Sequence, residues 1–367
     1  MRIVLISYHG LADYSIGLAN ALASSHQVML VIPRQSVEPF RHKVHPDVQL
    51  LDMTFPRLRN PLNLVAAIRV FHAMRQFEPD VVHFQSGFIW FSFLLPWMKR
   101  WPLVTTIHDL RPHSGDTHSR RMQWFMPNKL AARYSDVLIA HSNFIRDQLI
   151  QKLNIAPERV YRTFSGDGFL YHDPVPANGR PAFDVLFFGR IMDYKGIRTL
   201  IDATARVVNV VPDYKACIAG EGRLSLEDDS SIDGSAHYDV YNYFIEPQLA
   251  AKLFQQSKIV VLPYNDASQS GVIPLAYSFA RPVIATTVGG LPEIVEHQRT
   301  GLLIPPNDDA ALADAVIRLL QDENLRQELG TNGHRKVQLE MSWIHAAKET
   351  VAVYKNAKRH HENENNE

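Results

Sequence analysis

Residues 185–208 read VLFFGRIMDYKGIRTLIDATARVV, and this stretch decides the fold class. The apolar run at 185–188 predicts a buried strand, and the periodic run that follows the loop predicts a helix. Between them lie Gly189, which permits a tight backbone turn, and the cations Arg190 and Lys195. Two cations beside the start of a helix favour a diphosphate ligand, and a solvated loop is the alternative.

The same alternation of apolar runs and helical patterns extends along the whole chain. Strands are expected at 3–7, 28–32, 48–51, 81–84, 103–107, 137–140, 160–162, 185–188, 216–219, 240–244, 259–262, 283–285 and 302–304. Helices are expected at about 14–25, 61–76, 87–99, 119–134, 142–152, 196–208, 247–255, 272–280, 308–321, 323–338 and 342–357. This order predicts an α/β protein with two doubly wound, Rossmann-like domains, and ligands then bind beyond the carboxyl ends of the strands.

A segment rich in proline and glycine, residues 163–182, interrupts the alternation and indicates a domain boundary. We expect an N-terminal domain at 1–170, a linker at 171–182 and a C-terminal domain at 183–340. A final helix capped by Ser342 follows at 341–358, and a polar, disordered tail at 359–367.

Composition excludes several classes of protein. The 38 Lys and Arg residues balance 38 Asp and Glu residues, whereas a dedicated nucleic-acid binder is usually basic. Cys217 is the single cysteine, which excludes an intramolecular disulfide and cysteine-cluster metal sites. Residues 1–175 hold 19 Lys and Arg against 13 Asp and Glu, so this half suits an anionic partner unless the excess is chance surface composition.

A second loop with candidate binding residues follows the strand at 259–262. Its sequence, ASQSG at 267–271, is small and rich in hydroxyl groups, and it leads into a helix at Val272. The backbone N–H groups of such a loop can cradle a phosphate, and a capped surface loop is the alternative.

In order and spacing, these segments resemble the second domain of the GT-B glycosyltransferases of family 4. The family pattern G-R-x-x-x-x-K-G matches residues 189–196, and its G-x-G strand end matches 219–222. P-V-I-A matches 282–285, and G-G-x-P-E matches 289–293. The resemblance is strong over about 180–355 and weaker over 1–170, and it implies a GT-B fold whose last helix crosses back to the first domain.

The resemblance also implies roles for residues of the second domain. Arg190 and Lys195 would be catalytic, neutralising the leaving diphosphate. The donor-binding residues would be Gly189, Phe244 near the nucleobase, Ser268, Gln269, Ser270, Gly271 and Val272. One departure concerns the family's E-x7-E glutamates, which fall on Ala267 and Leu275. Asp266 replaces the first of them if the loop shifts by one residue. For Phe244, packing in the core is the alternative.

The first domain contains T-T-I-H-D at 105–109, which resembles the family's T-x-H-D at a strand end. His108 would then be catalytic and hold the donor sugar, with a structural histidine as the alternative. Gly10 lies where the family keeps a glycine-rich loop near the phosphate, and it would bind the donor.

The implied function is a retaining, metal-independent transfer of a hexose from a nucleotide-diphosphate sugar to a saccharide or lipid-linked acceptor, without a cofactor. The reaction would serve the assembly of bacterial cell-surface polysaccharide or glycolipid. We expect a cytoplasmic protein. Two alternatives stay open, a non-catalytic GT-B scaffold subunit and a GT-B nucleotide-sugar epimerase.

The most apolar window, GFIWFSFLLPWM at 87–98, is too short to span a bilayer. A buried helix is the simpler interpretation. Peripheral contact with the inner face of the plasma membrane through 87–101, helped by Lys99 and Arg100, is the alternative.

Overall fold

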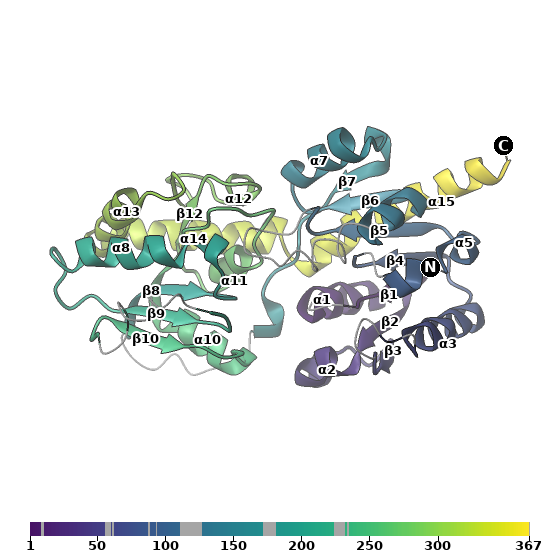
Figure 1. Ribbon diagram of the computed structural model, residues 1–367, viewed down its shortest axis with the longest axis horizontal. Helices are drawn as coiled ribbons and strands as arrows, with labels where there is room; N and C mark the ends of the chain where they lie inside the picture. Colours follow the sequence, from purple (N-terminus) through teal and green to yellow (C-terminus); the bar gives the residue numbers. More distant parts are fainter. Residues whose placement is uncertain are drawn as a thin grey trace. The chain divides into compact units, whose positions relative to one another are not determined.

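The computed structural model describes residues 1–8, 11–55, 60, 62–86, 89–92, 94–110, 127–171, 181–223, 232 and 235–366 (Figure 1). The described chain forms two compact units. The first is built from the residues up to Gly166 and from Ser342 onward, and the second runs from Asp167 to Met341. Each unit is organised around one sheet.

The first unit holds a sheet of seven strands in the order β3-β2-β1-β4-β5-β6-β7, and every pair is parallel. The strands are β1 Arg2–Ile6, β2 Gln27–Pro33, β3 Val48–Met53, β4 Val81–Phe84, β5 Leu103–Ile107, β6 Val137–Ala140 and β7 Val160–Arg162. Its helices include α1 Ala12–Ala23, α2 Arg34–Val37, α3 Leu62–Phe77, α4 Ile89–Ser92, α5 Leu95–Met98, α7 Asn143–Leu153 and α15 Trp343–Asn366.

The second unit holds a sheet of six parallel strands in the order β10-β9-β8-β11-β12-β13. The strands are β8 Phe183–Phe188, β9 Ala216–Ala219, β10 Tyr238–Tyr241, β11 Ser257–Leu262, β12 Val283–Thr286 and β13 Gly301–Ile304. Its helices include α8 Ile197–Val207, α10 Pro247–Gln255, α11 Val272–Ser278, α12 Leu291–Ile294, α13 Asp309–Gln321 and α14 Glu323–Glu340. The expected fold class, two doubly wound α/β halves, is confirmed.

The strands form where the sequence is continuously apolar because both faces of each sheet are covered. All four residues of β6 are buried, for example, as are all four of β9. Serine side chains cap two helices of the first unit, and the cap expected at Ser342 is confirmed. The Ser142 hydroxyl accepts a hydrogen bond from the Ile145 N–H at 3.2 Å, and Ser342 does the same for His345 at 3.2 Å.

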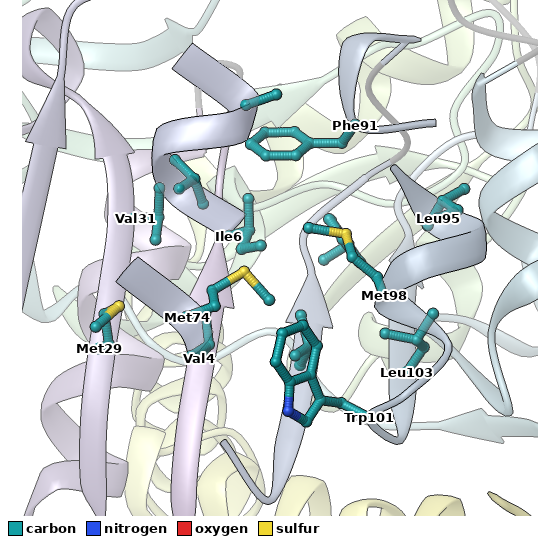
Figure 2. Packing of buried hydrophobic residues seen from close by; sticks show 14 residues of the cluster. Val4, Ile6, Met29, Val31, Met74, Phe91, Leu95, Met98, Trp101 and Leu103 are labelled. Carbon is teal, nitrogen blue, oxygen red and sulfur yellow. The ribbon is translucent and has the colours of Figure 1, made fainter. Parts of the chain in front are cut away.

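One core of the first unit lies between β1, β2, β4 and β5 and the helices α3 and α5 (Figure 2). Met74 of α3, Met98 of α5 and Trp101 meet there, and all three are at most 8% exposed. The segment expected as one helix at 87–99 is instead two short helices, α4 and α5. Pro96 lies in the first turn of α5, where its missing N–H is tolerated. A single helix over 87–99 would place Pro96 in the helix interior, where proline breaks the hydrogen bonding.

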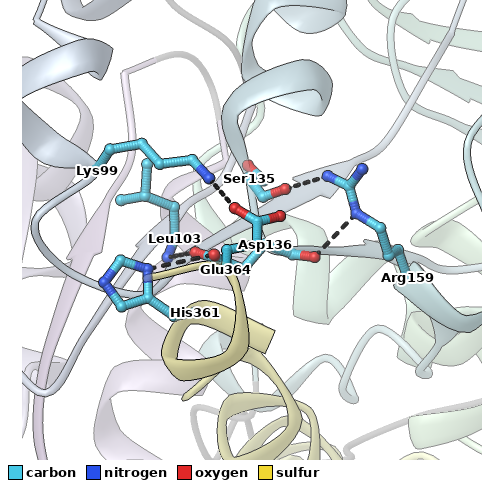
Figure 3. Close-up of polar contacts among 7 residues, drawn as sticks. All are labelled: Lys99, Leu103, Ser135, Asp136, Arg159, His361 and Glu364. Atoms are coloured by element: carbon cyan, nitrogen blue, oxygen red, sulfur yellow. Dashed lines mark hydrogen bonds and ion pairs between the residues drawn. The ribbon is translucent and has the colours of Figure 1, made fainter. Parts of the chain in front are cut away.

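The expectation of a disordered tail at 359–367 is wrong for the described residues, since α15 continues to Asn366. Two polar contacts hold this end of the helix against the first sheet (Figure 3). His361 Nδ1 lies 3.3 Å from Asp136 Oδ1, and Glu364 pairs with Lys99. A polar sequence was expected to stay solvated, and these partners, distant in sequence, order it instead.

The strand expected at 240–244 is shifted toward the N-terminus, because pairing with β9 ends at Tyr241. Tyr243 then turns back, its N–H donating to the Tyr241 carbonyl at 3.0 Å. Of the linker expected at 171–182, residues 172–180 lie outside the described part of the chain.

Candidate active site

Two loops approach closely at the carboxyl edge of the second sheet. Gly189 follows β8 with φ +117°, and its N–H donates to the Ala219 carbonyl at 2.9 Å. A Cβ at Gly220 would lie 2.0 Å from the Gly189 carbonyl oxygen. The loop after β8 is therefore fixed against the loop after β9, and Arg190 projects from this fixed backbone with an exposed side chain.

Lys195 is held by an aromatic ring. Its ammonium lies 3.8 Å from the ring centre of Tyr264, which follows β11 and is only 1% exposed. A cation over a buried ring is attracted by the ring's negative face. The Asn265 N–H also donates to the Tyr194 carbonyl at 2.7 Å, so the two loops are joined through the backbone as well.

Gly196 completes this junction and begins α8 in a left-handed conformation, with φ +70°. A Cβ there would lie 1.8 Å from the Pro263 carbonyl oxygen. Only glycine fits both the backbone angle and the space, so the position of Lys195 depends on it.

The loop before α11 lies beside the Gly189 turn. Val272 Cγ2 is the nearest atom to a Cβ placed on Gly189, at 3.9 Å. Ser268 and Ser270 are buried, Asp266 and Gln269 are half-buried, and Gly271 is exposed with open space at its Cα. The Val272 N–H donates to Ser270 Oγ at 3.3 Å, and α11 has only seven residues. The structure thus places this loop next to Gly189.

Tyr264 interacts electrostatically with Arg190 of the loop after β8 and with Ser270 of the loop before α11. Burial raises the pKa of its hydroxyl, and the Ser270 hydroxyl and the Arg190 charge oppose that rise. Lys195 lies on the ring of this buried phenol, and Arg190 is near enough for its charge to act on the hydroxyl. Sequence reasoning missed Tyr264, although its place two residues after a strand was a usable signal.

The two positions that lack the family's glutamates are part of the interior. Ala267 is 2% exposed and Leu275 is 4% exposed. Leu275 packs closely on Gly168, where an added Cβ would lie 2.4 Å from Leu275 Cδ1. Neither residue presents a polar group, so any sugar contact from this loop belongs to its neighbours.

Phe244 lies on the loop between β10 and α10, at the outer edge of the sheet. Its side chain is 57% exposed and that of Tyr243 is 51% exposed. The alternative that these aromatics pack in the core is therefore wrong, and a stacking role for Phe244 stays a prediction.

In the first unit, His108 directly follows β5 and is buried in a cluster of rings. Its ring centre lies 5.3 Å from that of Tyr14 and 5.0 Å from that of His141, and Trp343 lies 5.2 Å from Tyr14. Sequence reasoning missed His141, which directly follows β6. Gly10 lies outside the described part of the chain.

The histidines of this region are neutral at physiological pH. Burial lowers the pKa of His83 and of His108 to about 3, and the nearby His141 adds to both shifts. Burial also lowers the pKa of His141 to about 4. His141 Nδ1 lies 3.0 Å from the Thr163 carbonyl oxygen. Because a carbonyl oxygen can only accept a hydrogen bond, Nδ1 of His141 carries the hydrogen. His83 lies between Tyr354 and Thr106, with both hydrogen bonds at 2.7 Å. His108 thus faces any ligand as a neutral ring.

Among the described residues, no group of three or more His, Cys, Asp or Glu side chains is arranged to hold a metal ion. No helix in the same residues has the length and apolarity needed to cross a membrane.

Two family models match the chain, one in each half. Glycosyltransferase Family 4 matches residues 8–163, and Glycosyl transferases group 1 matches residues 182–322. An uncharacterized glycosyltransferase of Methanocaldococcus jannaschii is 34% identical over 47% of this chain and 44% of its own length. A D-inositol 3-phosphate glycosyltransferase of Saccharomonospora viridis is 28% identical over 76% of this chain and 71% of its own length.

Solved structures agree on the fold. Sucrose-phosphate synthase from Thermosynechococcus elongatus is 22% identical, with a TM-score of 0.74 over 97% of this chain and 98% of that one. Anabaena HepE in complex with UDP-glucose is 17% identical, with a TM-score of 0.75 over 97% and 99% of the two chains. The family matches in both halves agree with the two parallel sheets and with the motifs at their edges. The chain belongs to the family 4 (group 1) glycosyltransferases with the GT-B fold.

Proposed function

We propose that this protein transfers a hexose from a nucleotide-diphosphate sugar to a hydroxyl acceptor, with retention of configuration and without a metal ion. The observation that carries the proposal is the pair of cations at the carboxyl edge of β8. Lys195 lies on the Tyr264 ring, and the charge of Arg190 acts on the same phenol. Similar proteins support the reaction class: one is a D-inositol 3-phosphate glycosyltransferase, and HepE, which has the same fold, binds UDP-glucose in its structure.

The chemistry follows from where negative charge develops. As the glycosidic bond to the donor breaks, charge accumulates on the leaving diphosphate, and fixed cations stabilise that state more than the ground state. Arg190 can bind two phosphate oxygens through its planar guanidinium, whereas Lys195 acts as a point charge. The ring under Lys195 limits its motion, so less reorganisation is needed during the reaction. Retention and the sugar-binding role of His108 are carried over from the family resemblance.

The acceptor is proposed to be a saccharide or a lipid-linked sugar in the assembly of cell-surface polysaccharide or glycolipid. This part of the proposal rests on the family resemblance alone. Incubating the protein with radiolabelled nucleotide sugars and candidate acceptors, with chelator present, tests both the acceptor class and the independence from metal. The anomeric configuration of the product, measured by NMR, tests retention.

Binding of the donor nucleotide is tested by calorimetric melting with UDP, GDP, ADP, TDP or CDP in chelator. A ligand at about 100 times its dissociation constant should stabilise the protein by about 2.7 kcal/mol. Arg190→Ala and Lys195→Met should abolish the shift. Arg198→Ala is the matched control, because Arg198 is exposed on α8 and pairs with Asp202 at 3.1 Å. Equal shifts in all three variants would overturn the diphosphate assignment.

Tyr264 provides a separate test of how Lys195 is positioned. Tyr264→Phe keeps the ring under the ammonium, and nucleotide affinity should change less than threefold or so. Tyr264→Leu removes the ring and should weaken binding by about fivefold to thirtyfold, as expected for about 1–2 kcal/mol of cation–π attraction. If both variants bind alike, the ring does not position Lys195.

The scaffold alternative is favoured by one observation, the apolar burial of Ala267 and Leu275. A scaffold subunit would bind no nucleotide sugar or would bind it without turnover. Transfer or hydrolysis of any nucleotide sugar, lost in Lys195→Met, would exclude this alternative.

A further inference from the structure

The outer face of α3 shows an unusual combination of exposed apolar and cationic side chains. Leu62 is 59% exposed, Val65 is 45% exposed and Ile68 is 50% exposed. Arg69 and Arg75 continue the face toward the end of the helix, and both are exposed. We call these five residues the α3 surface. Leu62, Val65 and Ile68 recur at intervals of three, Arg69 follows Val65 by four and Arg75 follows Ile68 by seven, so all five lie on one side of the helix.

The α3 surface is the solvent side of a well-anchored helix. On the opposite side, Ala67, Val70 and Met74 are fully buried in the core of the first unit. The apolar residues of the α3 surface are therefore not needed for that core. A helix with an apolar face in solvent, flanked by cations, is the type that lies on membrane surfaces.

A segment that contacts α3, residues 97–101, adds an exposed tryptophan and an exposed arginine to the first unit. Trp101 contacts Phe71 of α3, with ring centres 5.6 Å apart, and the Arg100 guanidinium lies 5.3 Å from the Trp101 ring. Trp97, on α5, is 63% exposed. Exposed tryptophans and arginines are the residue types that settle at the boundary between lipid headgroups and acyl chains.

Membrane contact through 87–101 stays a prediction, and the structure describes only part of that window. Phe91, Leu95 and Met98 are at most 2% exposed in the core, so they are not available to a lipid. Among the residues of that window whose side chains the structure describes, Pro96, Trp97 and Arg100 are exposed.

The charge of the α3 surface indicates which kind of partner binds it. No Asp or Glu occurs in α3, and the first half of the chain has an excess of cations. An anionic lipid surface complements that charge. A second copy of the chain fits less well, because a symmetric pairing of two α3 helices would bring arginines together with no carboxylate on either helix.

We infer that the α3 surface docks the protein on an anionic phospholipid surface. Val65 and Ile68 enter the apolar boundary, while Arg69 and Arg75 contact the headgroup phosphates. The inference concerns the first unit alone and does not depend on the transferase activity proposed above.

Co-sedimentation with lipid vesicles tests the inference. The full-length protein should bind vesicles of equal parts phosphatidylcholine and phosphatidylglycerol, bind phosphatidylcholine alone much more weakly, and be released by salt. Arg69→Gln with Arg75→Gln should lower the partition constant about thirtyfold, since each cation near an anionic surface contributes about fivefold. Val65→Asn with Ile68→Asn should lower it by a similar factor or more.

The matched control is Val210→Asn, an equally exposed apolar residue of the second unit, at 51% exposure. It should bind vesicles as the wild type does, and thermal melting checks that every variant is folded. Equal binding to neutral and anionic vesicles, or binding that the α3 variants leave unchanged, would overturn the inference. So would a dimer in analytical ultracentrifugation that Val65→Asn with Ile68→Asn dissociates, because the surface would then belong to a second copy.

Discussion

Acidification should destabilise the first unit, because that unit buries His83, His108 and His141 as neutral rings. Their pKa values are about 3, 3 and 4, against 6.5 for an ordinary histidine. Below pH 6.5 the unfolded chain gains protons that the folded chain cannot accept, so stability falls as the pH falls from 6.5 toward these lower values. Above about pH 7 this effect vanishes.

The magnitude follows from the size of the shifts. At pH 5 the ordinary pKa lies about 1.5 units above the solution pH, so each histidine costs about 2 kcal/mol. The three together cost about 6 kcal/mol, which is comparable to the whole stability of a typical domain, about 5–15 kcal/mol. The first unit should therefore be marginal or unfolded near pH 5.

Tryptophan fluorescence during urea unfolding measures this unit alone, because all five tryptophans fall within its sequence ranges. The free energy of unfolding should drop by about 6 kcal/mol between pH 7 and pH 5, and His141→Gln should reduce that drop by about a third. In that variant the glutamine amide can still donate to the Thr163 carbonyl. His72→Gln, at an exposed position on α3, is the control. If the wild-type free energy changes by less than about 1 kcal/mol, the argument from buried neutral histidines is refuted.

Two further predictions concern backbone space and the end of α15. Gly196→Ala should cost the second unit about 3 kcal/mol, through its left-handed φ and the 1.8 Å approach to the Pro263 carbonyl. Calorimetry measures that loss, and a melting temperature within about a degree of wild type would contradict it. Deleting residues 360–367 should cost the first unit about 1–3 kcal/mol, since it removes His361 from the buried Asp136 and Glu364 from Lys99. An unchanged urea midpoint by tryptophan fluorescence would show that these contacts stabilise nothing.

Much of the fold was predictable because parallel strands are buried on both faces. The strands β4, β5, β6, β7 and β9 have the bounds that the apolar runs predict. Errors arose where distant partners decide the local structure. The helix end near His361 is polar in sequence, and its order is explained by partners far away in the chain, Asp136 at 225 residues from His361 and Lys99, which pairs with Glu364.

In the candidate site too, local sequence signals were readable and contacts between residues far apart in the chain were not. Gly189, Arg190 and Lys195 could be proposed from the sequence because their signal is local, a strand end followed by cations. Tyr264 was missed because its role depends on a ring placed under an ammonium 69 positions earlier in the chain, and no spacing rule encodes that contact. The apolar outer face of α3 was missed for a similar reason, since only the packed core shows which side of an apolar helix is left in solvent.

The loss of the two loop glutamates is best understood as a change in charge balance. Carboxylates at Ala267 and Leu275 would have opposed part of the positive field around Arg190 and Lys195. Buried apolar residues at those positions leave that field stronger, which favours a diphosphate. In the proposed function, the same change removes two strong acceptors for sugar hydroxyls, and we expect the neutral Ser268, Gln269 and Ser270 to supply selectivity. We therefore expect tighter binding of the nucleotide diphosphate, relative to the intact nucleotide sugar, than in relatives that keep both glutamates. Comparing the two dissociation constants by calorimetric titration tests this expectation, and a strong preference for the intact sugar donor would contradict it.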